Sequence, residues 1–320
     1  MSEDSMTAIE FLERYSTEDD CLDAIENFRW PKGFRCPNCD HDDGYRLKTR
    51  PLIQCSVCRH QTSMTAGTIF HKTRIPLRNW FWIIYSAAQD KGGVSSTRLA
   101  EQLGMYQKTV WNILHKIRHA MAKRDEAILL AGLIELDGMF VGSEARKMGR
   151  KHKNTTVDDC LGKPNMPRVT FRNGRMQTEV IVMVEAERWR AGSIAMRVVD
   201  SSSYQDIKEF AELRAEENQV FKTDGFGSNY ALRTVSNTHI AKTCSGEESV
   251  EWLPIVHRAI SLVKRALLGT YHGVNPMYLQ RYLDAFCFRF NRRNKPSSIA
   301  SSLLRACVFA LPMTYAELKL

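Results

Sequence analysis

The chain has 320 residues, of which 43% are hydrophobic, and carries a formal net charge of +9 with a pI near 9.1. This length allows two or three domains with real cores, and the charge favours a polyanionic partner. The sequence opens without an apolar signal-peptide core and contains no run of about 18 apolar residues, so we expect neither secretion nor a transmembrane span. Nine cysteines in such a protein indicate thiol or metal roles in a reducing cytosol rather than disulfides.

Residues 6–30 are expected to form two helices. Their apolar residues follow a helical spacing and would form one face: Ile9, Phe11, Leu12, Leu22, Ile25 and Phe28. Residues 16–18, Ser-Thr-Glu, should end the first helix and cap the second, which Trp30 and Pro31 then terminate. We assign this segment a packing role.

The most specific local motif is a pair of Cys-x-x-Cys turns. Cys36 and Cys39 form the first turn, Cys55 and Cys58 form the second, and fifteen residues separate the two. This spacing is typical of a four-cysteine zinc site, in which four thiolates fill the coordination sphere and mark a structural metal. Residues 45–54 can form a small β-hairpin between the turns. A redox pair and a chance spacing are the alternatives.

Positive charge gathers around this zinc ribbon. Residues 32–78 contain nine Lys and Arg against three Asp, which is consistent with a surface that binds phosphates. Because four cysteines already supply the ligands, we expect His41, His60 and His71 at the surface.

Residues 76–124 are predicted to be helical and to contain a helix-turn-helix. A strongly apolar helix at 80–89 ends at Lys91-Gly92-Gly93, and Ser95 and Ser96 would cap a short helix at 97–103. Gly104 then makes a turn before a longer helix at 107–121. A short helix, a turn with Gly and a longer helix form the layout of a helix-turn-helix; an ordinary helical hairpin is the alternative.

The second helix of such a motif would enter the major groove with its first residues. After Tyr106 these are Gln107, Lys108 and Thr109, whose types contact bases or phosphates. The apolar residues of this helix would face the core: Trp111, Leu114 and Ile117.

Two Asp-Gly pairs are the candidate catalytic positions. Residues 133–141, Leu-Ile-Glu-Leu-Asp-Gly-Met-Phe-Val, are predicted to form a buried strand with Asp137 in its middle. Asp224 ends a second predicted strand at 219–223. A charge in a buried strand is costly unless it is paired or binds a metal, and two such carboxylates on neighbouring strands suit Mg²⁺. Taken singly, each pair is equally compatible with a turn.

The second half of the chain predicts an α/β core with a mixed sheet. Further strands are expected at 178–185, 192–199 and 239–241, with a helix at 204–218. Residues 143–177 carry nine Lys and Arg against three acidic residues and should form a basic loop. That loop is either a solvated insertion or an arm that clamps DNA.

Two helices are expected to follow, at 252–268 and 276–291. The second ends in a basic stretch interleaved with aromatic residues, in which Arg292 and Arg293 are candidate phosphate contacts. The alternative is a solvated helix end stabilised by the helix dipole.

Together these motifs resemble a bacterial insertion-sequence transposase of the zinc-ribbon, ISXO2-like family, which is related to the Merlin transposons and has an Asp-Asp-Glu or Asp-Asp-Asn catalytic domain. The resemblance covers nearly the whole chain from Cys36 onward. It is most specific in residues 252–264, 268–274 and 282–293.

The resemblance implies a ribonuclease-H-like catalytic core behind the zinc ribbon and helix-turn-helix. The corresponding domains would be residues 1–31, 32–75, 76–128 and 129–320. It also implies two-metal-ion phosphodiester chemistry, in which Asp137 and Asp224 hold Mg²⁺ or Mn²⁺. Lys264 would neutralise charge on the phosphate or fix the strand.

The resemblance also implies the partners of the protein. They would be double-stranded DNA, both as terminal inverted repeats and as target. Since two ends must be handled together, a homo-oligomer is expected, located in the bacterial cytoplasm with the nucleoid.

Three positions depart from the family pattern. Leu262 stands where the family has a third catalytic Asn, Gly138 follows the first Asp in place of an acidic residue, and Ala285 replaces a Glu. Leucine cannot bind a metal. The chain is therefore either an active transposase with another third ligand or a weakened copy that persists as a sequence-specific DNA-binding protein. A nuclease that cuts without joining is a further alternative.

His257 is the first candidate for the missing third residue. Residues three or four apart on a helix share a face, so His257, Ile260 and Lys264 project to nearly the same side, whereas Leu262 should point elsewhere. We expect His257 to line the site as a metal ligand or phosphate contact, or else to be a structural histidine. Glu251 is a second candidate.

Overall fold

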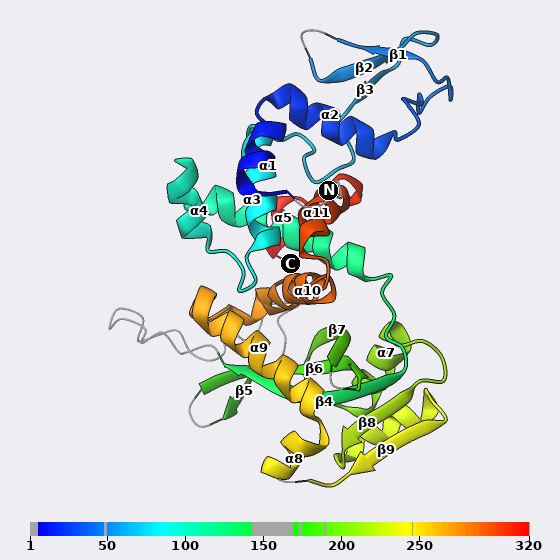
Figure 1. Ribbon diagram of the computed structural model, residues 1–320, viewed down its shortest axis with the longest axis vertical. Coiled ribbons are helices and arrows are strands. Elements are labelled where there is room, and N and C mark those ends of the chain that lie inside the picture. The colour runs from blue at the N-terminus through cyan, green and yellow to red at the C-terminus, as the bar shows by residue number, and fades with distance from the viewer. Residues whose placement is uncertain are drawn as a thin grey trace. The chain divides into compact units, whose positions relative to one another are not determined.

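The computed structural model describes residues 6–47, 50–142, 169–172, 175–188, 190–244 and 246–319, which form two compact units (Figure 1). The first unit contains the chain up to Asp90, Val94–Arg124 and Asn294–Lys319. The second contains Lys91–Gly93 and Asp125–Arg293. Within the described residues, no helix has the length and apolar character needed to cross a membrane.

The first unit begins with the two expected helices, α1 (Ala8–Arg14) and α2 (Glu18–Arg29). Thr7 and Thr17 cap them through capping boxes, each paired with an acidic residue three positions on. The expectation that the apolar residues form one packed face is wrong at two positions, because Ile9 and Leu12 are 70% and 47% exposed. The α1 helix has only seven residues, of which Phe11 alone is buried.

A three-stranded antiparallel ribbon follows, with the order β1 (Gly44–Arg46), β2 (Leu52–Cys55) and β3 (Gln61–Ser63). The β1–β2 pair, with Tyr45 opposite Gln54, confirms the predicted hairpin. Arg29 on α2 anchors the ribbon by donating to the carbonyl oxygens of Ser63, Met64 and Ala66.

The remaining helices of the first unit are α3 (Leu77–Gln89), α4 (Ser96–Leu103), α5 (Gln107–Asp125), α11 (Ile299–Phe309) and α12 (Tyr315–Lys319), with a 3-10 turn at Pro296–Ser298. Gly104 ends α4 with φ +61°, a conformation that glycine adopts without strain. The α11 helix packs against α2 and α3. The last 26 residues described, Asn294–Lys319, therefore belong to this unit.

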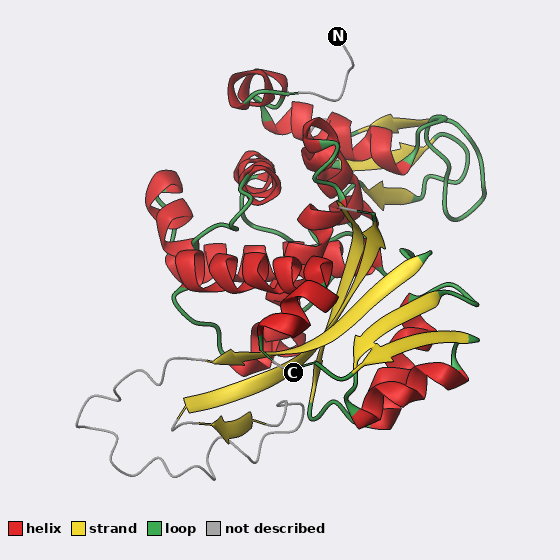
Figure 2. Ribbon diagram, turned by 60° about the horizontal axis from the view of Figure 1, so that its bottom comes forward, coloured by secondary structure: helices red, strands yellow, loops and turns green. Residues whose placement is uncertain are grey.

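The second unit is built on a six-stranded sheet (Figure 2). Its strands are β4 (Leu133–Gly142), β5 (Val169–Arg172), β6 (Arg175–Glu187), β7 (Arg190–Val199), β8 (Val220–Asp224) and β9 (Thr238–Lys242). The order is β5-β6-β4-β8-β9, and β7 also pairs with β6. The β4–β8 and β8–β9 pairs are parallel, whereas β6 is antiparallel to β4, β5 and β7.

The expectation that residues 143–177 form a loop is wrong in part, because β5 and the start of β6 occupy 169–172 and 175–177. These segments pair with each other in an antiparallel ladder, which satisfies their backbone groups. The rest of that loop lies outside the described residues.

Helices cover both faces of the sheet, since the strands alternate their side chains. On β4, Ile134 and Leu136 join one core with α7 (Tyr204–Arg214) and the 3-10 helix Gly227–Thr234, while Met139 joins the other core. The second face is covered by α9 (Pro254–Tyr271) and α10 (Leu279–Asn291), which α8 (Glu247–Trp252) precedes and a 3-10 turn at Pro276–Tyr278 connects.

Two predicted helices differ from the structure. The helix expected at 204–218 ends at Arg214, because the next segment pairs with Leu130 through Leu130 N–H to Arg214 O and Glu216 N–H to Leu130 O. The helix expected at 252–268 is interrupted at Leu253, and Pro254 begins α9, where proline is favoured as the first helical residue.

Candidate metal centre and candidate active site

The two Cys-x-x-Cys turns have the same backbone geometry. Cys36 N–H donates to His41 O, and Cys55 N–H donates to His60 O, both at 2.9 Å. The residue after each second cysteine, Asp40 or Arg59, has a positive φ near 60°. Each turn therefore presents two sulfur atoms on one tight loop.

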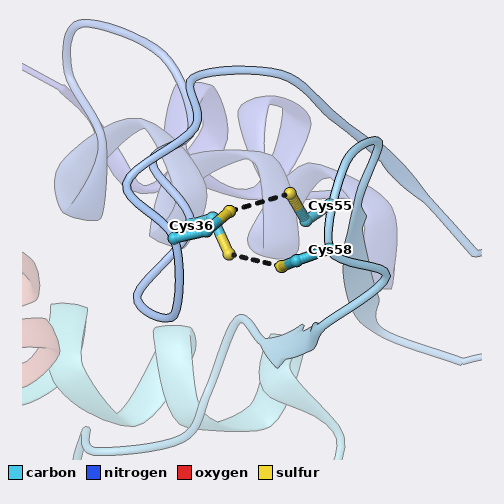
Figure 3. Close-up of side chains that lie close together, drawn as sticks. Cys36, Cys55 and Cys58 are labelled. Carbon is cyan, nitrogen blue, oxygen red and sulfur yellow. Dashed lines mark hydrogen bonds between the residues drawn. The ribbon is translucent and has the colours of Figure 1, made fainter.

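The four sulfur atoms converge on one point (Figure 3). All lie within 4.8 Å of one another, with Cys36 Sγ 3.5 Å from Cys58 Sγ and Cys39 Sγ 3.6 Å from Cys55 Sγ. Tetrahedral bonds of about 2.3 Å require sulfur separations of about 3.8 Å, so the cluster fits Zn²⁺. Without a metal the thiols share their protons unequally: a hydrogen bond from the His60 backbone lowers the pKa of Cys58 to about 6, whereas, despite a backbone hydrogen bond from His41, hydrogen bonds with the neighbouring thiols raise the pKa of Cys39 to about 12.

Asp137 and Asp224 lie at the same level on neighbouring parallel strands. The register pairs Leu136 on β4 with Thr223 on β8, and each Asp follows directly. Because the strands run in the same direction, this register brings the two carboxylates to one region of the sheet.

Groups around Asp137 have opposing effects on the pKa of its carboxyl. Burial raises its pKa most, and Asp224 adds to that effect. His257, the Gly138 backbone N–H and Lys264 lower it. Gly138 N–H donates to Oδ1 at 2.8 Å, and His257 Nε2 lies 3.6 Å from Oδ2.

Asp224 is held by its own turn. Its Oδ1 accepts hydrogen bonds from Phe226 N–H at 3.3 Å and from Asn229 Nδ2 at 2.6 Å. Asn229 is buried in the 3-10 helix that follows the strand. These bonds orient the carboxylate while leaving Oδ2 without a hydrogen bond among the described residues.

The third candidate, His257, lies beside Asp137, with its Nε2 3.6 Å from Oδ2. Its Nε2 is also 3.0 Å from Ser249 Oγ on α8. Leu262 is 39% exposed. Glu251 is exposed on α8. The distance keeps His257 as a candidate for the site, and its role stays a prediction.

Two residues that fix α9 were not singled out from the sequence. Glu135 is 2% exposed on β4, and its Oε2 accepts the backbone N–H groups of Ile255 and Val256, both at 2.8 Å. Trp252 donates its Nε1–H to Thr223 O at 2.8 Å. The junction of α8 and α9 is thus bound to both strands that carry the candidate aspartates, which sets the position of His257.

The donor set suits a hard divalent cation. Carboxylate oxygens are the ligands Mg²⁺ prefers, and such an ion would relieve the repulsion between Asp137 and Asp224. Among the described residues, the cysteine cluster is the single group of three or more His, Cys, Asp and Glu whose ligand atoms close to within 4.8 Å. The ligand atoms of Asp137, Asp224 and His257 therefore do not all lie within 4.8 Å of one another.

The candidate DNA-binding residues of α5 lie at its exposed start. Tyr106 is 87% exposed, and Gln107 and Lys108 are exposed beside it. Gln107 Nε2 donates to Ser96 Oγ at 2.7 Å, and Lys108 Nζ lies 5.5 Å from the Tyr315 ring centroid. Thr109 is half-buried.

The two candidate arginines at the end of α10 have intramolecular partners. Arg292 pairs with Asp125 at 2.7 Å, with both side chains largely buried. Arg293 donates to Gly192 O and Phe290 O, and also to Ala191 O. These contacts bind the end of α10 to its own unit, and phosphate binding by either arginine stays a prediction.

Comparison with known proteins finds matches along most of the chain. Residues 129–291 match the family described as "ISXO2-like transposase domain", and residues 16–61 match "Transposase zinc-ribbon domain". The chain is 23% identical over 224 residues to a Halobacterium salinarum protein described as an uncharacterized protein in transposable element ISH50, covering 67% of this chain and 70% of that protein.

A likeness to a solved structure is weak. The Mos1 transposase paired-end complex with left transposon end matches with a TM-score of 0.29 at 13% identity, covering 72% of this chain and 79% of that chain. The assignment below therefore depends on the two domain matches.

Proposed function

This chain belongs to the ISXO2-like transposase family, as its motifs predicted, and we propose that it cuts and joins the ends of an insertion sequence by two-metal-ion chemistry. The observation that carries this proposal is the register of β4 and β8, which sets Asp137 and Asp224 side by side. The approach of His257 to Asp137 supports the same site.

Asp137 and Asp224 would hold Mg²⁺ or Mn²⁺. When bound, the metal lowers the pKa of an attacking water or DNA 3′-hydroxyl and stabilises the leaving oxygen. Asn229 and the Phe226 N–H keep the Asp224 carboxylate oriented, and Glu135 holds α9 in place. Lys264 would neutralise phosphate charge, and His257 would complete the site as a ligand or a phosphate contact.

The sheet order supports a ribonuclease-H-like core. Such a core is a mixed sheet with one antiparallel strand among parallel ones, and here β6 runs against β4 and β7 while β8 and β9 run with β4. We propose this core within the expected domain at 129–320, whose last segment, Asn294–Lys319, packs in the first unit.

The first unit would recognise the inverted repeats. The α4–Gly104–α5 arrangement supports a helix-turn-helix, with Gln107, Lys108 and Thr109 at the start of its second helix. The zinc ribbon at 32–75 would add phosphate contacts. Because both ends of the element must be cut and joined together, the active form would be a homo-oligomer.

The test uses duplex DNA that carries the element's own inverted repeats. The proposal expects Mg²⁺-dependent nicks at the repeat ends and joined products with a target duplex. Nicks without joined products would favour a hydrolytic nuclease. Metal-independent binding without any strand cleavage would favour a DNA-binding protein descended from a transposase.

A further inference from the structure

The helix α9, which covers one face of the sheet, carries positive charge on its outer side (Figure 1). Between Pro254 and Tyr271 the sequence contains Arg258, Lys264 and Arg265 but no Asp or Glu. All three cationic side chains are exposed. The buried side of the helix is apolar and packs on the sheet: Ile255, Val256, Ala259, Ile260, Val263 and Leu267. The outer side of α9 therefore presents positive charge that no acidic residue of the helix offsets.

This charged surface adjoins the candidate catalytic residues. His257 Nε2 lies 3.6 Å from Asp137 Oδ2, which fixes the side of α9 that borders the site. A helix turns by about 100° per residue, so Lys264 lies about 20° from His257 on one side. Ser261 and Arg265 lie about 40° and 80° from His257 on the other side. None of the buried residues of α9 falls within this arc, so an exposed surface leads from His257 to Arg265.

Arg265 is available for a ligand. Its guanidinium has no hydrogen-bond or ion-pair partner among the described residues, whereas Arg292 pairs with Asp125. Ser261, which lies between His257 and Arg265 on the helix surface, is small, and its hydroxyl donates to His257 O at 2.9 Å. No long side chain of α9 therefore separates Arg265 from the candidate site.

The sign of the surface charge changes where α8 meets α9. Glu247 and Glu251 are exposed on α8, and the third acidic residue of that helix, Glu248, pairs with Lys242. A chain of phosphates is repelled by the exposed acids and attracted by the outer side of α9. The charges thus favour a DNA path over α9 rather than over α8.

We propose that the outer side of α9 binds the sugar-phosphate backbone of the duplex next to the phosphate that is cleaved, with Arg265 as a direct phosphate contact and Arg258 beside it. The inference rests on the proposed function and names the surface that positions the DNA at that site. Such contacts set the register of the duplex on the protein and carry no base preference of their own.

The geometry limits which phosphate Arg265 can reach. A helix with its side chains is about 10–12 Å across, and a duplex advances about 3.4 Å per nucleotide of one strand. Because Arg265 directly follows Lys264, its phosphate should lie within about four nucleotides of the one at Lys264.

The first test measures DNA binding without cleavage. The full chain, loaded with Zn²⁺ and without Mg²⁺, is titrated into a fluorescein-labelled duplex that carries the element's inverted repeat, at several salt concentrations. Arg265→Gln should reduce by about one the slope of log affinity against log salt concentration and weaken binding about eightfold at about 0.1 M salt. Arg233→Gln is the matched control, because it removes the same charge from the exposed surface of the 3-10 helix that packs on the other face of the sheet. It should leave both values unchanged.

The second test locates the contact on the DNA. Neutral methylphosphonates replace single phosphates of the same duplex, and each is measured with the unchanged chain and with Arg265→Gln. At the contacted phosphate, the methylphosphonate should weaken binding to the unchanged chain and have no further effect on the variant. This position should lie within about four nucleotides of the cleaved phosphate.

A salt slope and an affinity that Arg265→Gln leaves unchanged would overturn the inference, as would coupling at no phosphate or only at a distant one. A variant that dissociates an oligomer at unchanged DNA affinity would overturn it in favour of a contact between copies of the chain. Failure of the proposed function is distinguishable, because the unchanged chain would then lack Mg²⁺-dependent cleavage while the salt slope still depended on Arg265.

Discussion

Glu135→Ala should destabilise the second unit by removing the cap of α9. The carboxylate accepts two backbone N–H groups at 2.8 Å while almost fully buried. Hydrogen bonds to a charged group contribute about 1.5–3 kcal/mol each, which gives roughly 3–6 kcal/mol for the pair. Removing the carboxylate also removes its desolvation cost, so we expect a net loss of about 2–4 kcal/mol.

Urea denaturation followed by tryptophan fluorescence measures this change. Glu135→Gln keeps an acceptor oxygen but loses the charge at the helix N-terminus, so it should lose only about 1–2 kcal/mol. Glu212→Ala is the control, because it removes an exposed ion pair with Lys208 and should change stability by less than about 0.5 kcal/mol. If Glu135→Ala is no more destabilising than this control, the assigned cap is wrong.

Four further predictions concern the zinc ribbon, a buried acid, DNA affinity and the third catalytic residue. Cys36→Ser should lose the single Zn²⁺ per chain and unfold the ribbon, as measured by metal analysis and limited proteolysis; an ordered zinc-free ribbon would contradict this. Burial raises the pKa of Asp284 to about 7 from an ordinary 3.8, so its contribution to stability is present at pH 4 and is lost as pH rises to 7, by at most about 4 kcal/mol. Asp284→Asn should abolish this loss in denaturation curves, and an unchanged pH dependence would refute the assignment. Lys108→Ala should reduce by about one the slope of log affinity for DNA against log salt concentration, whereas a salt-independent affinity would exclude phosphate binding. His257→Ala should reduce strand cleavage at least about tenfold; if it has no effect while Leu262→Asn increases strand transfer, the histidine assignment is wrong and the chain is a weakened transposase.

Local sequence patterns predicted the elements that carry the candidate site. The run of apolar and β-branched residues at 133–141 predicts β4, and the Asp-Gly at the end of 219–225 predicts the end of β8. The Cys-x-x-Cys spacing likewise predicts the metal ribbon, because each turn fixes its own two ligands locally. In each case the deciding interactions lie within a few residues.

What the sequence did not predict depends chiefly on long-range contacts. The apolar spacing continues across residues 252–256, yet the helix breaks at Leu253, because the residue before Pro254 is disfavoured in a helix, a local signal that the spacing alone does not take into account. Trp252 and the α9 N–H groups then bond to strands 29 and about 120 residues away, which fixes the two helices in place. In the sequence, Glu135 resembles an ordinary strand residue, because its role depends on hydrogen bonds with α9, which lies about 120 residues away in the chain. Arg292 similarly looked like a free basic side chain, but Asp125 neutralises it.

The most direct measurement of the central claim is divalent-metal binding at the paired aspartates. Calorimetric titration of Mn²⁺ into the full chain, with the ribbon already loaded with Zn²⁺, should show binding that Asp137→Asn and Asp224→Asn each weaken at least about tenfold and that the exposed Asp42→Asn leaves unchanged. The same two variants should lose metal-dependent strand cleavage. Mn²⁺ binding that is undiminished in both Asp137→Asn and Asp224→Asn would contradict the account.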